Sequence, residues 1–271
     1  MAHKPAPPPT SRRPSPVLGL RPRPPSPAVR ERGSTAALML RQILAPLHPD
    51  GWKFVGGAAV ATVILFILWP PLGWLGLILT LWIAYFFRDP WRVTPTRPGR
   101  TDSGLIVSPA DGIVVSLGPA SPPPELDMGT APLPRIGIFL NLFDVHVARA
   151  PIGGKLTARR YTKGRFVNAS LDKASTDNER LGLRIAPEEG PAIACVLIAG
   201  LVARRIVCGV YEGQSLAVGE RIGIIRFGSR CDVYCPPPYV PLVALGQRMI
   251  AGETVLADRL APEPPREGFA H

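Results

Sequence analysis

Residues 222–234 read Ile222-Gly223-Ile224-Ile225-Arg226-Phe227-Gly228-Ser229-Arg230-Cys231-Asp232-Val233-Tyr234. A glycine–serine pair here separates two runs rich in β-branched and aromatic residues, which favour strands. We therefore predict one strand over residues 222–225 and a second over residues 231–234. The Gly228–Ser229 bond would then lie at the junction between the two strands.

The residues from about Thr94 onward share this texture of short strand-like runs broken by glycine and proline. Turn signals at such short spacing predict a compact, mainly β domain of sandwich or barrel type. The pattern Gly-x-x-x-x-x-Gly-Glu occurs twice, from Gly213 and from Gly246, and resembles the hairpins of lipoyl and biotinyl carrier domains. Neither copy carries a lysine, so we expect the carrier-like architecture without the carrier function. Further strand-like runs lie at residues 104–107, 112–115, 135–140, 192–198 and 204–211.

Residues 54–87 contain no charged side chain and consist mainly of apolar residues. A run of this length is too long for a buried strand and long enough to enter a bilayer. The segment Trp69-Pro70-Pro71-Leu72-Gly73 divides the run, because tandem proline followed by glycine breaks a helix. We therefore predict a membrane-anchoring helical hairpin within residues 36–93, which either spans the bilayer or dips into it. Basic residues on both flanks place both ends on the cytoplasmic face of the cell (inner) membrane.

The N-terminal residues 1–35 differ from both of these regions. Residues 1–32 hold ten prolines, seven Lys/Arg and one acid, so we predict a disordered Pro/Arg-rich tail. The formal net charge of the whole chain is +11, which indicates an anionic partner. Nucleic-acid binding would require basic residues interleaved with aromatics on a soluble surface, and the sequence has no such cluster. We therefore expect an anionic membrane surface as partner, and no nucleic acid.

Strain at a glycine–serine junction permits a chemical step. The Ser229 hydroxyl can attack the Gly228 carbonyl and convert the amide to an ester, which loss of the α-proton then breaks. Hydrolysis of the resulting dehydroalanine leaves a pyruvoyl group, a protein-bound ketone that accepts electrons much as pyridoxal phosphate does. The step needs a base, and His146 is the only histidine in the β-rich region before the C-terminal residue. Asp111, in an Asp-Gly turn, is the best candidate to orient that base, and Asp144 is a rival if it shares a strand face with His146.

Five motifs, in this order, resemble the short-form phosphatidylserine decarboxylase proenzymes. The resemblance covers roughly residues 51–258 and is specific because the motifs occur together. They are Ser108-Pro109-Ala110-Asp111-Gly112, Phe143-Asp144-Val145-His146-Val147, Asn168-Ala169-Ser170-Leu171-Asp172-Lys173, Ala199-Gly200-Leu201-Val202-Ala203-Arg204-Arg205-Ile206, and residues 226–232.

This resemblance implies a β-rich catalytic domain over residues 94–271 that cleaves itself between Gly228 and Ser229. The products would be a large subunit, 1–228, and a small subunit, 229–271, which carries a pyruvoyl cofactor formed from Ser229. The implied reaction converts phosphatidylserine to phosphatidylethanolamine and CO2, with Ser229, His146 and Asp111 as catalytic residues and without a metal. The oligomeric state is left open, a homo-oligomer included.

One position departs from the family pattern. Longer members carry a second histidine three residues after the first, and this chain has Arg149 there. Either His146 serves both steps, or Arg149 holds a phosphate or a carboxylate. Arg149, Arg204 and Arg205 are therefore candidate substrate-binding residues.

Three other functions compete with this interpretation. A membrane-anchored serine hydrolase could use Ser229, His146 and Asp111, although the Gly-x-Ser-x-Gly elbow is absent. A non-enzymatic, membrane-tethered β scaffold would remain one intact chain. A pyruvoyl decarboxylase could also act on another amino-acid headgroup, since the hairpin indicates a lipid substrate without identifying its headgroup.

Overall fold

The computed structural model describes residues 45–99, 104–167, 169, 174–200, 205–225, 229–266 and 268. The predicted tail over residues 1–35 lies outside these ranges. Three parts of the predicted site also lie outside them: Arg204, Gly228 and most of the motif over residues 168–173.

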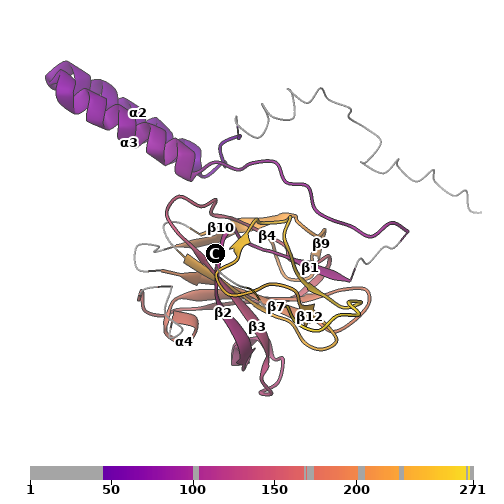
Figure 1. Ribbon diagram of the computed structural model, residues 1–271. Helices are drawn as coiled ribbons and strands as arrows, with labels where there is room; N and C mark the ends of the chain where they lie inside the picture. Colours follow the sequence, from indigo (N-terminus) through magenta and orange to yellow (C-terminus); the bar gives the residue numbers. More distant parts are fainter. Residues whose placement is uncertain are drawn as a thin grey trace, which may run out of the picture. The chain divides into compact units, whose positions relative to one another are not determined.

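Two apolar helices, α2 (Gly51–Leu68) and α3 (Pro70–Phe86), form the predicted hairpin (Figure 1). The break falls at Trp69, where extended backbone precedes the two prolines. The helices pack through small residues, as membrane helices do. The Thr62 and Thr80 hydroxyls lie 2.9 Å apart in a hydrogen bond across the interface, and a Cβ at Gly73 would lie 2.3 Å from the Phe66 ring.

The outer surface of the hairpin is apolar and exposed. Ile67 and Leu68 at its tip are 78% and 74% exposed. By length and composition α2 can cross a membrane, and α3 is a shorter apolar helix. At 1.5 Å per residue the 18-residue α2 is about 27 Å long, close to the ~30 Å of a hydrocarbon core.

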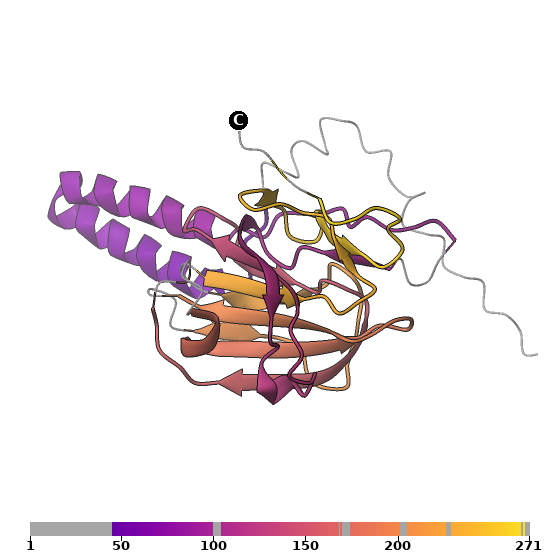
Figure 2. The ribbon, with the colours of Figure 1, turned by 60° about the horizontal axis from the view of Figure 1, so that its bottom comes forward.

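An eight-stranded antiparallel sheet forms the body of the protein, and its long strands are visible in Figure 2. Its strands alternate between residues buried in the main core and residues on the other face. In spatial order they are β13 (Arg248–Met249), β2 (Gly112–Ala120), β3 (Leu133–Leu140), β11 (Ser229–Tyr234), β7 (Ile193–Ala199), β6 (Arg180–Ala186), β5 (Gly154–Thr162) and β9 (Ser215–Leu216).

Two three-stranded sheets complete the domain. One contains β1 (Leu105–Val107), β14 (Val255–Asp258) and β12 (Val240–Pro241), and the other contains β4 (Val147–Arg149), β10 (Arg221–Ile225) and β8 (Ile206–Cys208). A 3-10 turn, η2 (Pro124–Leu126), and the short helix α4 (Ala174–Asp177) lie between strands. The two predicted strands around the glycine–serine pair are therefore β10 and β11, and they belong to different sheets.

The predicted fold class, a mainly β domain preceded by a helical hairpin, is confirmed. One run length was wrong, since the run over residues 204–211 yields only the three-residue β8. The two carrier-like repeats do correspond structurally, since each encloses a two-residue strand, β9 or β13.

The foot of the hairpin, which we define as residues 45–54 and 85–92, packs against the sheet of β4, β10 and β8. Its two chain segments are joined by hydrogen bonds from His48 N to Phe87 O (2.8 Å) and from Asp89 N to Pro46 O (2.7 Å). The buried rings of Phe86 and Phe87 pack with Val147 of β4 and Ile224 of β10. The hairpin and the sheet of β4, β10 and β8 therefore share a hydrophobic cluster.

Candidate active site

Ser229 is the first residue of β11, in the middle of the eight-stranded sheet. It pairs with Leu140 of β3 on one side and with Ala199 of β7 on the other. Its side chain is fully buried, and its Oγ has no hydrogen-bond partner among the residues that the structure describes. A buried polar atom without a partner costs free energy, so its retention indicates a chemical role.

His146 lies immediately before β4 and is also fully buried. Its backbone carbonyl accepts a 3.1 Å hydrogen bond from the amide of Ile225, the last residue of β10. Its Nδ1 donates to the carbonyl oxygen of Asp144 at 2.9 Å, because a carbonyl can only accept. This bond places the proton on Nδ1 and the basic lone pair on Nε2.

The surroundings of His146 keep its ring neutral. The Phe86 ring packs against it with the centroids 4.3 Å apart. Burial above all, with a smaller contribution from the charge of Arg88, lowers the pKa of His146 from 6.5 to about 4, against smaller opposing effects of Asp144. At neutral pH the imidazole is therefore available as a proton acceptor.

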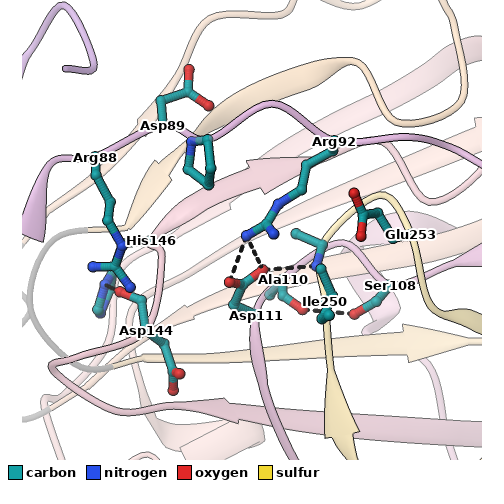
Figure 3. Close-up of polar contacts among 12 residues, drawn as sticks. Arg88, Asp89, Arg92, Ser108, Ala110, Asp111, Asp144, His146, Ile250 and Glu253 are labelled. Carbon is teal, nitrogen blue, oxygen red and sulfur yellow. Dashed lines mark hydrogen bonds and ion pairs between the residues drawn. The ribbon is translucent and has the colours of Figure 1, made fainter. Parts of the chain in front are cut away.

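Asp144 lies in a turn and not on the strand, so the expectation that it shares a strand face with His146 is wrong. Its Oδ2 accepts a 2.9 Å hydrogen bond from the amide of Asn141, and its Oδ1 pairs with Arg248. Figure 3 shows the carboxylate directed away from the His146 ring. The hydrogen bond between Asp144 and the histidine involves the main chain of Asp144, and its carboxylate acts on the ring through its charge.

Asp111 occupies the tight turn before β2, where Gly112 has a φ of 152° and a Cβ would lie 2.2 Å from the Phe139 carbonyl oxygen. Its carboxylate accepts hydrogen bonds from Arg92 Nη2 (2.7 and 3.0 Å) and from the Ala251 amide (2.8 Å) (Figure 3). Burial raises the pKa of Asp111, and Arg92 opposes that rise. No hydrogen bond joins Asp111 to His146 in the part of the chain that the structure describes.

Arg149 is buried, and its guanidinium is held within the protein. It donates to Asp89 Oδ1 (3.1 Å), Gly219 O (3.0 Å) and Pro90 O (3.1 Å). The same Asp89 carboxylate also pairs with Arg221 of β10. These bonds hold Arg149 on a carboxylate of the protein itself, and its role as a substrate-binding residue stays a prediction. Arg205 is exposed just before β8, and its role as a substrate-binding residue stays a prediction.

A buried polar network covers the face of β11 opposite Ser229. The Arg230 side chain donates to Asp232 Oδ1 (2.6 Å) and to Ser116 Oγ (2.7 Å). Asp232 Oδ2 accepts from Ser175 Oγ at 2.8 Å. Sequence reasoning missed this network, because its members come from β2, α4 and β11.

Sequence reasoning also missed the contribution of residues 86–92. They supply Phe86 against His146, Asp89 to Arg149, and Arg92 to Asp111. The signal was the dense set of charges in Arg88-Asp89-Pro90-Trp91-Arg92, directly after a run with no charge. Charges that flank an apolar segment are usually interpreted as setting its orientation in the membrane, so the sequence did not indicate that these residues contribute to the site.

Comparison with known proteins gives one consistent result. The family model described as phosphatidylserine decarboxylase matches residues 79–257. Proteins named "Phosphatidylserine decarboxylase proenzyme" are 56% identical in Cereibacter sphaeroides (86% of this chain, 98% of the relative) and 54% identical in Beijerinckia indica (88% and 99%). A relative of the same name from Ruegeria pomeroyi is 59% identical over 79% of this chain and 96% of its own length.

Proposed function

Because the chain belongs to the phosphatidylserine decarboxylase family, we propose that it cleaves itself between Gly228 and Ser229 and then decarboxylates phosphatidylserine with a pyruvoyl group. The products are phosphatidylethanolamine and CO2. Family membership decides against the serine hydrolase and the non-enzymatic scaffold.

The observation that carries the proposal is the buried, unpartnered Oγ of Ser229 at the start of a strand paired on both sides. Ser229 is fully buried, without access to solvent. A nucleophile that attacks its own peptide bond needs no such access. The position therefore fits conversion of residue 229 in place.

The cleavage step balances as follows. Ser229 Oγ bonds to the Gly228 carbonyl carbon as the peptide C–N bond breaks, which gives an ester and a free amine on residue 229. Removal of the Ser229 α-proton expels the Gly228 carboxylate and leaves dehydroalanine, whose imine form takes up water and releases ammonia. His146 is the proposed base, with Nε2 as the accepting atom, and Asp111 is the supporting carboxylate.

The two subunits would stay together through strand pairing. The proposed small subunit supplies β11, which lies between β3 and β7 of the large subunit, and β13 and β14, which pair with β2 and β1. The colours of Figure 1 show the same mixing, with yellow C-terminal segments beside magenta and orange strands. Cutting one bond leaves all of these ladders intact.

A pyruvoyl group at position 229 would supply an electron-accepting carbonyl for loss of CO2 from a bound amino acid. The residues at this position suit it, since the ketone would replace a hydroxyl that has no partner in the structure. His146 would then deliver a proton to the substrate α-carbon from which CO2 has left. We infer that His146 serves both steps, since Arg149 is bound to Asp89 within the protein.

The hairpin would hold this site at the level of the lipid headgroups. Both of its ends lie at the foot, with basic residues on either side, which supports a cytoplasmic location at the inner membrane. Trp69 and Trp74 are exposed near the tip, and Trp52 and Trp91 are exposed at the foot. Two such pairs about 27 Å apart suit the two interfacial belts of a bilayer.

Intact mass of the purified protein, wild type beside Ser229→Ala, tests the proposal. We expect two wild-type pieces that divide between residues 228 and 229, the smaller one blocked at its N-terminus, and a single uncut variant. A folded wild-type protein that stays uncut would refute the proenzyme. A decarboxylation assay that compares phosphatidylserine with phosphatidylthreonine and with free serine then identifies the substrate.

A further inference from the structure

Five arginines surround the hairpin foot and the site: Arg88, Arg92, Arg149, Arg221 and Arg248. Four of them are neutralised by a carboxylate within the protein. Arg92 pairs with Asp111, Arg248 pairs with Asp144, and Arg149 and Arg221 share Asp89.

Arg88 is the exception. Its Nη1 donates to the Tyr85 carbonyl (2.8 Å) and its Nη2 to the Phe143 carbonyl (2.7 Å), while its Cζ lies 3.7 Å from the centroid of the Tyr85 ring. These partners orient the guanidinium without cancelling its charge. Among the described residues, none places a carboxylate within ion-pair distance of Arg88. The half-buried side chain keeps further N–H donors for an external anion.

The position of Arg88 matches that of a lipid phosphate. It follows the last residue of α3 by two positions, where an apolar helix would leave the hydrocarbon core and enter the headgroup layer. Phe143, which holds it, stands three residues before His146, and Figure 3 shows Arg88 beside the His146 ring. Its charge is near enough to affect the protonation of that histidine.

We propose that Arg88 binds the phosphate of the phosphatidylserine headgroup and so places its serine moiety at His146. The inference rests on the proposed function. Phosphatidylserine offers two anions, a phosphate and a carboxylate, and catalysis separates them. A cation on the carboxylate would stabilise the ground state more than a transition state that is losing that charge, which would slow the reaction. A cation on the phosphate holds a group that the reaction leaves unchanged. The phosphate is also close to the reacting carbon, since only the ester oxygen and one methylene separate them.

The first test is steady-state kinetics of the full-length enzyme in mixed micelles with short-chain phosphatidylserine. Because the phosphate contact is equal in ground and transition states, Arg88→Gln should raise KM about tenfold or more and leave kcat within about threefold. Arg88→Lys should fall between wild type and Arg88→Gln. Lys53→Gln is the matched control, since it removes an exposed positive charge from the same foot. It should leave KM unchanged.

The second test distinguishes the two anions. Dihexanoyl phosphatidylethanolamine carries the phosphate and lacks the carboxylate. Its affinity is measured as an inhibition constant and, in the uncleaved Ser229→Ala background, by calorimetry. Arg88→Gln should weaken both by the factor that raises KM. The calorimetric measurement also covers the case in which Arg88→Gln fails to cleave.

Three outcomes would overturn the assignment. An unchanged KM would remove Arg88 from substrate binding, and an unchanged affinity for the phosphatidylethanolamine probe would move it to the carboxylate. An equal rise of KM in Lys53→Gln would show that the KM effect comes from general electrostatic attraction between the enzyme and the micelle, and not from a specific phosphate contact. Failure of the proposed function itself would look different, as an uncut and inactive wild type.

Discussion

The backbone amide of Ile225 donates a 3.1 Å hydrogen bond to the carbonyl oxygen of His146. Ile225 ends β10, and the chain reaches Ser229 of β11 four residues later. This bond continues the β4–β10 pairing and holds the proposed base beside the end of β10, although His146 and Ser229 are 83 residues apart in the sequence. The same edge of the small sheet receives Phe86 from the hairpin.

Replacement of His146 should abolish self-cleavage. In His146→Gln we expect a loss of at least about 10²-fold, because a general base contributes about that much or more. Precursor made by cell-free translation and followed on denaturing gels gives the rate. Normal cleavage of the variant would assign the base to another group.

The pH dependence of cleavage follows from burial of the same histidine. Since the pKa of His146 lies at about 4, the neutral fraction stays above about nine-tenths down to pH 5. The wild-type rate should therefore be flat from about pH 8 to pH 5 and halve near pH 4. A rate that halves near pH 6.5 would contradict the buried neutral ring. By the same linkage, the unfolded chain binds more protons than the folded one between pH 6.5 and 4, so stability falls as the pH drops through that window.

Asp111 can act as a carboxylate or only as the partner of Arg92, and two variants separate these roles. Asp111→Asn removes the negative charge, whereas Arg92→Gln removes the same ion pair and leaves the carboxylate. If Asp111 supports the base, cleavage should slow far more in Asp111→Asn than in Arg92→Gln. Equal slowing in both variants would make the ion pair itself the requirement. Initial cleavage rates of the two precursors provide the comparison.

Asp89 should be a major stability determinant, because its carboxylate serves two arginines. Asp89→Asn leaves the buried Arg149 without its counter-charge, which we expect to cost about 3 kcal/mol or more. Thermal unfolding in detergent should show a melting temperature lower by several degrees. Glu263→Gln is the control, since its ion pair with Arg266 is exposed and is worth below about 1 kcal/mol. Similar shifts in melting temperature in both variants would be evidence against a stabilising role for the pairs of Asp89 with Arg149 and Arg221.

Gly137 provides the space for the network beneath Ser229. A Cβ at this position would lie 2.5 Å from both Arg230 Nη2 and Ser116 Oγ. Gly137→Ala should therefore destabilise the protein by about 1–3 kcal/mol and slow cleavage, because β11 begins next to that network. Gly209→Ala is the matched control, since a Cβ there has no neighbour within 4 Å among the described residues. Wild-type stability and cleavage in Gly137→Ala would show that the network tolerates displacement.

Local patterns were enough to predict the elements that local physics controls. The uncharged run and its Trp-Pro-Pro break predicted two helices, because a missing amide hydrogen and a fixed φ act within a few residues. The runs rich in β-branched and aromatic residues within 222–234 predicted β10 and β11. His146 and Ser229 could be named from the sequence, since few residue types can perform the chemistry and motifs mark their positions.

The tertiary structure alone decided how these groups are used. Strand pairing spans long separations, so the sequence could not show that β10 and β11 lie in different sheets or that Ile225 contacts His146. Spacing suggested that Asp144 shares a face with His146, but a turn directs its carboxylate to Arg248. Ion-pair partners depend on which side chains meet in space. Only the fold could show that Asp89 neutralises Arg149, whereas Arg88 is held by two carbonyl groups and no described carboxylate lies within ion-pair distance of it.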